Sequence, residues 1–336
     1  MAETLLCLAT REPSVREYGF ELALCGALED SERLLARQLG AHVHGRRIAD
    51  IVAIDPGPEF DQRATITDET IPPAAIDAPV GPGQARPLRD VFPDRRPDER
   101  HRIADRAVET GFFESERRNG DRYVRQVARY PERWFDRLLG IENKPDLDRP
   151  GDLQTQLRTD VSLGLFDEVI LATASHVTGA HRNRLPEEVG IWLFDPDTGE
   201  REVLREPTSL PTDEWGLEVI EREAGQATVQ PVDPAAKARA RRRVAERAYG
   251  KGWRTFAWPA CARCDPDGAE PVAAVPYCSH YDRIVNPVKD CGESCRGYEP
   301  ADPPAVDVEA VRDSQSPWVR DPAGRQRRQV GLDRFE

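Results

Sequence analysis

The stretch that most constrains the fold of this chain is GIENKPDL, residues 140–147. Apolar residues lead into it and predict a β-strand over 139–144. Pro145 has no backbone N–H to donate, so the strand cannot continue past it in the interior of a sheet. Because side chains alternate along a strand, we expect Glu142 and Lys144 on one face and the residue between them on the other.

A carboxylate beside an ammonium at a strand end suits metal-assisted hydrolysis. The carboxylate can hold a divalent cation, while the lysine positions or deprotonates a water or neutralises charge on a phosphate. In a chain with 32% charged residues, such a triplet is usually a solvated strand edge. Here, however, the whole chain has four lysines against 43 arginines. An arginine cannot supply a compact ammonium whose pKa shifts readily, so the rarity of lysine favours a chemical role for Lys144.

The composition indicates a soluble chain with an unusual charge balance. The formal net charge is −13, with 60 acidic residues, and resembles that of proteins from salt-loving archaea. In that setting the acidity serves hydration and solubility, and it argues only weakly against a nucleic-acid partner. An ordinary acidic cytosolic protein is the alternative. No signal-peptide pattern or 18-residue apolar run is present, so we expect a cytoplasmic protein without a membrane partner.

The first 54 residues predict a helix followed by a strand. Apolar residues at three- and four-residue spacing predict a helix over 14–39, with Glu21 beside its apolar face. A run rich in β-branched residues predicts a buried strand over 43–54. Asp50 interrupts this strand, and a carboxylate buried there needs a partner or a metal. Alternatively, the strand begins at Ile51 and Asp50 belongs to the preceding turn.

The middle of the chain predicts an inserted segment. Residues 56–97 are rich in proline, glycine and acids, which favours a loop. A helix over 98–111 and a hairpin turning at Asn119-Gly120 follow, and together they resemble the helix and wing of a winged-helix module. A solvated hairpin is the simpler interpretation. If the module binds nucleic acid, its candidate phosphate contacts are Arg117, Arg118, Arg122, Arg125 and Arg129.

The second half begins with a strand–helix–strand pattern. A helix starting near Asp152 is followed by a buried strand over 166–175, so this strand should run parallel to the one at 139–144. Two hairpins are expected next, in VGIWLFDPDTGEREVLRE and GLEVIEREAGQATVQPV. A helix then runs from Pro234 to about Tyr249. This helix inverts the sign of the net charge locally, and it could aim the cysteine-rich segment that follows along bound DNA. It carries six basic residues and one acid: Lys237, Arg239, Arg241, Arg242, Arg243, Arg247 and Glu246.

This order of elements resembles the PD-(D/E)xK nuclease superfamily, the restriction-endonuclease-like fold of RecB-type nucleases and archaeal Holliday-junction resolvases. RIADIVAI looks like the strand that carries the first metal-binding aspartate of that superfamily, and GIENKPDL like the strand with the second acid and the lysine. DLQTQL and DEVILAT are similar to the next helix and core strand. The likeness covers residues 14–54 and 134–175. The wide separation of Asp50 and Glu142 requires an insertion, and Asp55 competes for the aspartate role.

The resemblance implies a role for each motif residue. Asp50 and Glu142 would hold Mg²⁺ or Mn²⁺, with Glu21 as an auxiliary ligand. Lys144 would orient the attacking water and steady the phosphate, and Gln156 would contact the phosphate or the metal shell. The implied fold is a mixed sheet flanked by helices. Its parts are a core of residues 1–58 and 131–232, an insertion of 59–130, a basic helix with a metal-binding module of 233–299, and a disordered tail of 300–336.

The cysteines predict a second metal site. Five of the seven lie between residues 261 and 295, and disulfides are rare in a reducing compartment. Cys261 and Cys264 form a C-x2-C pair, and Cys291 and Cys295 a C-x3-C pair after Cys278. This spacing is typical of a structural Zn²⁺ site built from four of the five, with His280 as a further candidate ligand. Buried thiols are the alternative.

A [4Fe–4S] cluster is the rival to zinc. Some RecB-type nucleases hold such a cluster with one early and three late cysteines, and Cys25 would be the early one here. Cys7 is interpreted as a core thiol. With either metal we expect its removal to unfold residues 255–299 and leave the core intact.

Three classes of function follow. The leading one is a metal-dependent nuclease that hydrolyses DNA phosphodiester bonds, with DNA repair or recombination as its setting. The second is a non-catalytic, zinc-containing nucleic-acid-binding or adaptor protein. The third is a zinc-stabilised interaction protein without a nucleic-acid role.

Overall fold

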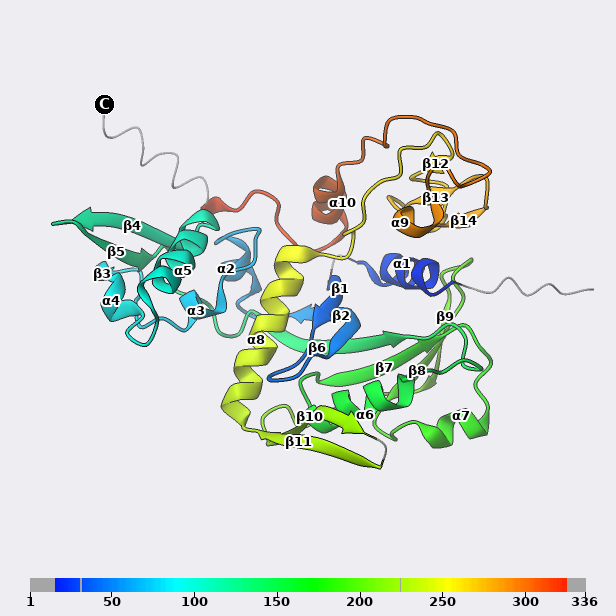
Figure 1. Cartoon of the computed structure of the whole chain (residues 1–336), viewed down its shortest axis with the longest axis horizontal. Coiled ribbons are helices and arrows are strands. Elements are labelled where there is room, and N and C mark those ends of the chain that lie inside the picture. The colour runs from blue at the N-terminus through cyan, green and yellow to red at the C-terminus, as the bar shows by residue number, and fades with distance from the viewer. Residues whose placement is uncertain (1–15, 31, 224, 325–336) are drawn as a thin grey trace, which may run out of the picture.

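The computed structural model describes residues 16–324 apart from residues 31 and 224, and a six-stranded mixed sheet forms its centre (Figure 1). The predicted α/β class is therefore confirmed. The first three strands are antiparallel, the next two run parallel to the third, and an antiparallel strand forms the far edge. Across the sheet they are β1 (Leu34–Gly40), β2 (Ile48–Pro56), β6 (Phe135–Asn143), β7 (Glu168–Thr173), β8 (Gly190–Phe194) and β9 (Arg201–Arg205).

The connection from β6 to β7 is the predicted strand–helix–strand unit. α6 (Leu153–Leu163) lies between the two strands in sequence, and they pair in parallel. A parallel pair needs such a crossover because the chain must return to the same end of the sheet. The helix ends at Gly164, whose left-handed backbone (φ 62°) favours a residue without a Cβ atom.

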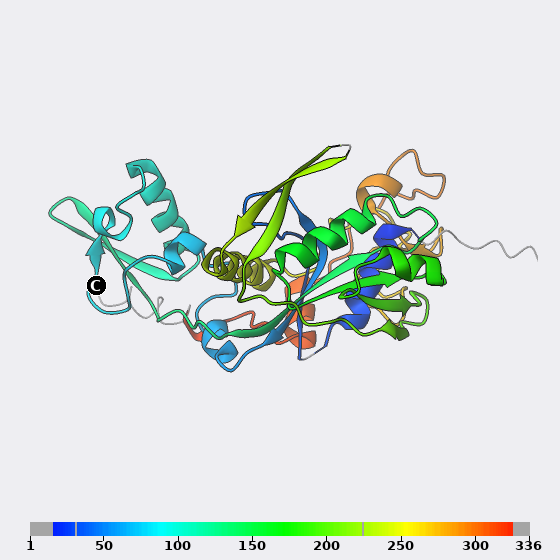
Figure 2. The same cartoon turned by 90° about the horizontal axis from the view of Figure 1, so that it is seen from below.

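Each face of the sheet has its own apolar core, because side chains alternate along the strands. Ile51 and Ile141 point to the face covered by α1 (Glu17–Leu28). Val52 and Leu138 point to the opposite face, which α6 and α8 (Pro234–Lys251) cover. α8 runs through the middle of the molecule, between the sheet and the segment inserted after β2 (Figures 1 and 2).

The cysteine-rich segment covers the outer side of α1 (Figure 1). Its residues Val272 and Val275 belong to the same buried cluster as the α1 side chains. A Cβ atom at Gly26 would lie 2.2 Å from Val272 Cγ1, so glycine permits this close approach. The segment therefore shares a buried core with α1 and the sheet. Its elements are β12 (Cys264–Asp265), β13 (Tyr277–Cys278), β14 (Arg283–Ile284) and α9 (Pro287–Asp290).

The insertion between β2 and β6 is a small α/β module at one end of the molecule (Figure 1). The predicted hairpin turns at Asn119 and Gly120, whose φ angles of 50° and 89° are positive, as a two-residue hairpin turn requires. Residues 56–97, predicted as a loop, contain short helices as well. The module consists of α2 (Phe60–Ala64), α3 (Pro73–Ile76), β3 (Arg86–Pro87), α4 (Leu88–Val91), α5 (Pro97–Glu109), β4 (Phe113–Arg118) and β5 (Asp121–Gln126).

The helix predicted over 14–39 is wrong in its second half. α1 ends at Leu28, and Leu34–Gly40 form strand β1. The leucines of β1 have helical spacing, but pairing with β2 satisfies the backbone of this segment and overrides the pattern. Both later hairpins are confirmed, as β8 with β9 and as β10 (Gly216–Glu223) with β11 (Gln226–Val232). α7 (Gly179–Arg184) lies between β7 and β8.

The C-terminal segment also differs from expectation. Within residues 300–324, which the composition predicts to be disordered, the chain forms α10 (Val308–Gln315) and buries Trp318. The Trp318 indole donates to the backbone oxygen of Asp68, and Trp318 and Val319 pack against the core. Cys7 and residues 325–336 lie outside the described residues. None of the described helices is long and apolar enough to cross a membrane.

Three arginines of α8 make contacts with other elements of the protein. Arg241 donates to the backbone oxygen of Leu165 and pairs with Asp167, and Arg243 donates to the backbone oxygen of His42. Arg242 pairs with Asp77 of the insertion. These three arginines therefore connect α8 to neighbouring elements, while Arg239 and Arg247 are exposed.

The one acid of α8 forms a fully buried ion pair. Glu246 Oε1 and Oε2 accept from Arg63 Nε and NH2 of α2, each at 2.7 Å, and both side chains are 0% exposed. The carboxylate also accepts from the Tyr130 hydroxyl at 2.8 Å and the Ile71 backbone N–H at 3.0 Å. Four donors around one carboxylate compensate for its removal from water.

Replacing Glu246 by alanine should therefore destabilise the protein strongly, because Arg63 would remain buried without a counter-charge. We expect a loss of about 3–5 kcal/mol in the free energy of unfolding, measured by urea titration. The matched control is Glu99→Ala, which breaks an exposed ion pair with Arg95 and should cost less than about 1 kcal/mol. Equal effects of the two substitutions would contradict the structural role of Glu246.

Candidate functional site

The strand register brings three polar side chains into one row across the sheet. The pair Ile51↔Ile141 of β2 and β6 makes Asp50 the neighbour of Glu142. On the other side, the pairs Arg37↔Ile51 and Leu39↔Ala49 place Gln38 beside Asp50. Gln38 has a positive φ of 53°, which is uncommon for a residue with a side chain. The register therefore places the predicted aspartate and glutamate side by side on neighbouring strands.

Glu142 lies on the α6 side of the sheet, where an arginine links it to a second acid. Arg47, from the loop before β2, donates through NH2 to Glu142 Oε2 at 2.5 Å and to Asp160 Oδ2 at 2.7 Å. Its Nε donates to Asp160 Oδ1 at 3.0 Å. All three side chains are nearly buried, with 10% or less of their surface exposed.

Glu21 approaches Asp50 from α1. Its carboxylate accepts from Gln38 Nε2 at 3.0 Å and Asn143 Nδ2 at 3.1 Å, and it pairs with Arg37 at 2.8 Å. Asp50 Oδ2 accepts the backbone N–H of Asn143 at 3.1 Å, and Gln38 Nε2 lies 3.4 Å from Asp50 Oδ1. The carboxylates of Glu21 and Asp50 therefore share two neighbours, one from β1 and one from β6.

Burial raises the pKa of each carboxyl group at this site. The pKa of Glu142 rises to about 8, because of burial first and the nearby Asp50 charge second. The pKa of Glu21 rises to about 7, again through burial, with a further contribution from Asp50. Burial also raises the pKa values of Asp50 and Asp160, partly offset by the Asn143 N–H and by Arg47 respectively. Asp50 and Glu142 are neighbours across β2 and β6, and each affects the pKa of the other.

The predicted lysine and glutamine lie at the edge of this group. Lys144 follows the end of β6, and its Nζ is 3.5 Å from Glu17 Oε1 in the first turn of α1. The charge of Glu17 acts on Asp50, so Lys144 borders the site but its ion pair is with Glu17. Gln156 is half-buried on α6, one turn before Asp160.

The structure distinguishes Asp50 from the two alternatives that the sequence left open for the metal-binding aspartate. Asp50 lies within β2, so the strand does not begin at Ile51. Asp55, five residues further along the strand, pairs instead with Arg33 and Arg137. Of the two aspartates, Asp50 is therefore the one beside Glu142.

Sequence reasoning missed four residues of the site: Gln38, Arg47, Asn143 and Asp160. Asp160 has a visible signal, because it lies four residues after Gln156 and thus on the same side of α6. Asn143 is the middle residue of the E-x-K triplet, and the alternation that separates it from Glu142 directs it to Glu21. Arg47 has no such signal, since its contacts depend on the path of a loop.

The donor chemistry fits a hard divalent cation. Asp50 and Glu142 present adjacent carboxylate oxygens, which Mg²⁺ and Mn²⁺ prefer. Asn143 is 1% exposed, and among the described residues its Oδ1 has no hydrogen-bond partner. In the arrangement shown, no group of three or more His, Cys, Asp or Glu side chains among the described residues is placed to hold one metal ion.

The clustered cysteines approach one another in the small sheet β12–β13–β14. Cys264 and Cys278 are direct partners across β12 and β13, and Cys261 Sγ accepts the Glu299 backbone N–H at 3.5 Å. Burial and the neighbouring thiols of Cys291, Cys261 and Cys278 raise the pKa of Cys264 to about 12. Every cysteine that the structure describes is a free thiol.

The remaining two described cysteines have other neighbours as well: Cys295 also affects the pKa of Cys291, and Cys25 lies in α1. Cys295 Sγ is 3.4 Å from the Tyr281 hydroxyl, to which it can donate. Cys25 is fully buried in α1, and burial raises its pKa well above the usual value. The charges that act on the Cys25 thiol come from Glu21, Arg37, Glu29 and Arg254 rather than from the cysteine cluster.

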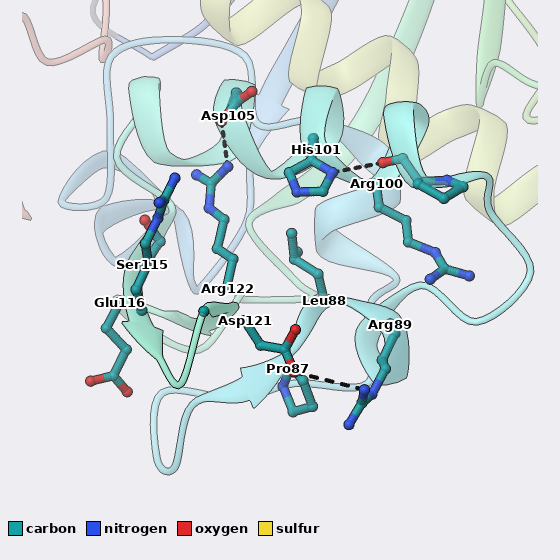
Figure 3. A pocket seen from close by; sticks show the side chains of 13 residues that line it. Pro87, Leu88, Arg89, Arg100, His101, Asp105, Ser115, Glu116, Asp121 and Arg122 are labelled. Carbon is teal, nitrogen blue, oxygen red and sulfur yellow. Dashed lines mark hydrogen bonds and ion pairs between the residues drawn. The ribbon is translucent and has the colours of Figure 1, made fainter.

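The insertion contains a hollow of about 630 Å³ between α5 and the β4–β5 hairpin (Figure 3). Several predicted phosphate-binding arginines pair with acids here: Arg122 with Asp105, and nearby Arg125 with Glu114. Both signs of charge therefore line or border it. The lining residues are Pro87, Leu88, Arg89, Pro97, Arg100, His101, Asp105, Ser115, Glu116, Arg117, Gly120, Asp121 and Arg122.

The raised pKa of Glu142 predicts that stability falls with pH in metal-free buffer. Between its ordinary pKa of 4.5 and about 8, the folded state retains a proton that the unfolded state has released. Folding is therefore progressively disfavoured as pH rises, by at most about 1.4 kcal/mol per pH unit for each retained proton. Urea unfolding at pH 5 to 8 with a chelator should show this slope. Glu142→Gln should flatten it and Asp55→Asn should keep it, whereas an unchanged slope in Glu142→Gln would refute the assignment.

Comparison with known proteins places the chain in a family. No curated protein and no solved structure matches it. A family profile matches residues 34–300, a range that holds Asp50, Glu142 and the clustered cysteines and omits α1 with Glu21. The profile describes a family of unknown function, and because it covers most of the chain, the protein belongs to this family, DUF5787.

Proposed function

We propose that this protein is a Mg²⁺-dependent nuclease-like protein of the PD-(D/E)xK superfamily that hydrolyses DNA phosphodiester bonds. The observation that carries the proposal is the adjacency of Asp50 and Glu142 on neighbouring strands. Glu21 of the preceding helix is linked to Asp50 through Gln38, which donates to both carboxylates. The order of elements supports it, because a helix, an antiparallel meander and a helical crossover to a parallel strand follow one another as in that superfamily.

In this proposal each side chain has a definite task. Asp50 and Glu142 would hold the metal, which would supply Lewis-acid stabilisation of the phosphate and a more acidic water. Glu21 orients the site through its bonds with Gln38 and Asn143. Lys144 would leave Glu17, with which it makes a single 3.5 Å contact, to act on the attacking water.

The insertion is the part that we assign to DNA. With its helix α5 and hairpin β4–β5 it has the two parts of a winged-helix-like module, and arginines line the hollow between them. These arginines serve backbone contacts, which position a duplex without reading its sequence. Gln156, on α6 beside the metal-binding row, would contact the cleaved phosphate.

A binding-only relative of such nucleases is the second candidate, and one observation favours it. Lys144 is paired with Glu17, and Glu142 is occupied by Arg47, so neither is free for chemistry in the arrangement shown. A non-catalytic, zinc-containing nucleic-acid-binding or adaptor protein could use the same fold with the site closed.

Cleavage of plasmid DNA with Mg²⁺ separates these candidates. Asp50→Ala and Glu142→Ala should each abolish cleavage, because the metal loses a carboxylate ligand. Lys144→Arg should also abolish it, since positive charge alone does not replace a compact ammonium. The control Asp55→Ala lies on the same strand outside the site and should retain the activity. Full activity of Lys144→Arg would refute the role of the lysine, and binding without cleavage by the unmodified protein would support the adaptor.

We also propose a structural Zn²⁺ held by Cys261, Cys264, Cys278 and Cys291. The cross-strand pairing of Cys264 with Cys278 and the mutual influence of the four thiols support this set. Cys295 is the spare cysteine, because its sulfur contacts Tyr281. The separate surroundings of Cys25 argue for zinc over a [4Fe–4S] cluster.

Elemental analysis tests the zinc proposal. We expect about one zinc per chain, retained in Cys295→Ser and lost in Cys278→Ser. Because Val272 and Val275 pack on α1, zinc loss should also lower the thermal stability of the whole protein. Iron with acid-labile sulfide that disappears in Cys25→Ala would establish the cluster in place of zinc.

A further inference from the structure

Arg47 occupies the centre of the candidate metal site. Its guanidinium lies between Glu142 and Asp160, and its charge also acts on Asp50. It is thus the cation that these three buried carboxylates share in the arrangement shown. A positive charge is required there, because several uncompensated carboxylates cannot remain ionised together in a buried site.

The bonds of Arg47 to its two partners are unequal. Asp160 accepts from both Nε and NH2, at 3.0 Å and 2.7 Å. Glu142 accepts from NH2 alone, at 2.5 Å. A fork of two hydrogen bonds fixes a guanidinium far better than one. Arg47 can therefore release Glu142 and remain attached to Asp160.

The backbone that carries Arg47 is held firmly. Glu218 of β10 accepts the backbone N–H groups of Val43, His44 and Gly45, at 2.8, 2.7 and 3.1 Å. Glu218 is 1% exposed, so these bonds are protected from water. Any exchange at Glu142 is therefore a movement of the Arg47 side chain and not of the loop.

On the α1 side of β6, one buried hydrogen-bond acceptor has no partner among the described residues. Asn143 Oδ1 has no hydrogen-bond donor among the described residues, although the side chain is buried and its Nδ2 is bonded to Glu21. The backbone N–H of the same residue binds Asp50. This oxygen belongs to a side chain that points to the α1 side of β6, toward Glu21, whereas Glu142 points toward α6. It is therefore an acceptor position for a water on the α1 side and not a ligand shared with Glu142.

We propose that Arg47 is an internal counter-cation that a divalent metal displaces from Glu142, while Asp160 keeps the guanidinium beside the metal. This inference rests on the proposed metal-dependent function. It makes Arg47 and Asp160 positioning residues: the arginine keeps the carboxylates folded and neutralised before the metal arrives, and it competes with the metal for Glu142. Metal binding then frees a guanidinium next to the position of the cleaved phosphate.

Calorimetric titration of the full chain with MnCl₂ tests this competition. In Arg47→Gln the metal no longer has to displace a cation, so its Kd should fall by about tenfold or more relative to the unmodified protein. The matched control is Arg33→Gln. Arg33 pairs with Asp55, which lies on β2 like Asp50 but outside the site, so this substitution should leave the Kd unchanged. Mn²⁺ should also raise the melting temperature of Arg47→Gln more than that of the unmodified protein.

The outcomes distinguish this inference from the proposed function. Suppose that the unmodified protein binds Mn²⁺ and that Asp50→Asn abolishes this binding. If Arg47→Gln then binds Mn²⁺ no more tightly than the unmodified protein, the counter-cation role of Arg47 is refuted and the metal site is retained. Absence of binding in both the unmodified protein and Arg47→Gln would overturn both. If Arg47→Gln does not fold, Arg47→Lys serves instead: a single ammonium cannot span the two acids, so tighter Mn²⁺ binding supports the inference and an unchanged Kd refutes it.

Discussion

The buried carboxylate of Glu246 is the interaction on which the arrangement of this protein depends. It accepts four hydrogen bonds from side chains and backbone on three other segments, and no water is needed to satisfy it. A charge buried in this way is tolerated only if all its partners are in place together, so it fixes the position of α8 against the insertion. The same helix holds the loop before β2 through Arg243 and caps two carbonyls of β1 through Lys251. The strands that carry the candidate site are thereby placed by a helix that contributes no side chain to the row of carboxylates.

The candidate site follows from the two-residue period of strands and from the cost of burying charge. Register makes Asp50 and Glu142 neighbours, and alternation sends Glu142 toward α6 and Asn143 toward α1. Burial raises the pKa of both acids, and the charge of Asp50 raises that of Glu142 further, so a nearby cation is needed to keep them ionised. Arg47 meets that requirement from inside the chain, and a divalent metal would meet it from outside. Arg47 and a metal would compete for the same carboxylate oxygens. The arrangement with Arg47 bound to Glu142 is therefore compatible with both of the proposed functions.

The sequence predicted the parts of this structure that have local causes. β6 and β7, the crossover between them, α5 and the three hairpins all carry a clear periodicity or a turn signal, and all are present. The sequence failed to predict β1, because its leucines have the spacing of a helix and only its pairing with β2 makes it a strand. Asp50 and Glu142 could be found because each interrupts an apolar strand. Arg47 and Asp160 could not be joined from sequence, since 113 positions separate them and their contact depends on a loop held by Glu218.

The distribution of apolar residues in α1 links the cysteine-rich segment to the site. A helix that covers a sheet from outside normally has a polar face, but Phe20, Leu22 and Leu24 of α1 are all 0% exposed. Such a helix must be buried on both sides, and Val272 and Val275 provide the second side. Because α1 carries both Glu17, which pairs with Lys144, and Glu21, which is linked to Asp50 through Gln38, the position of these groups depends on the cysteine-rich segment that packs on α1. Zinc bound there would act on the candidate site through α1, by keeping the outer layer of its core in place.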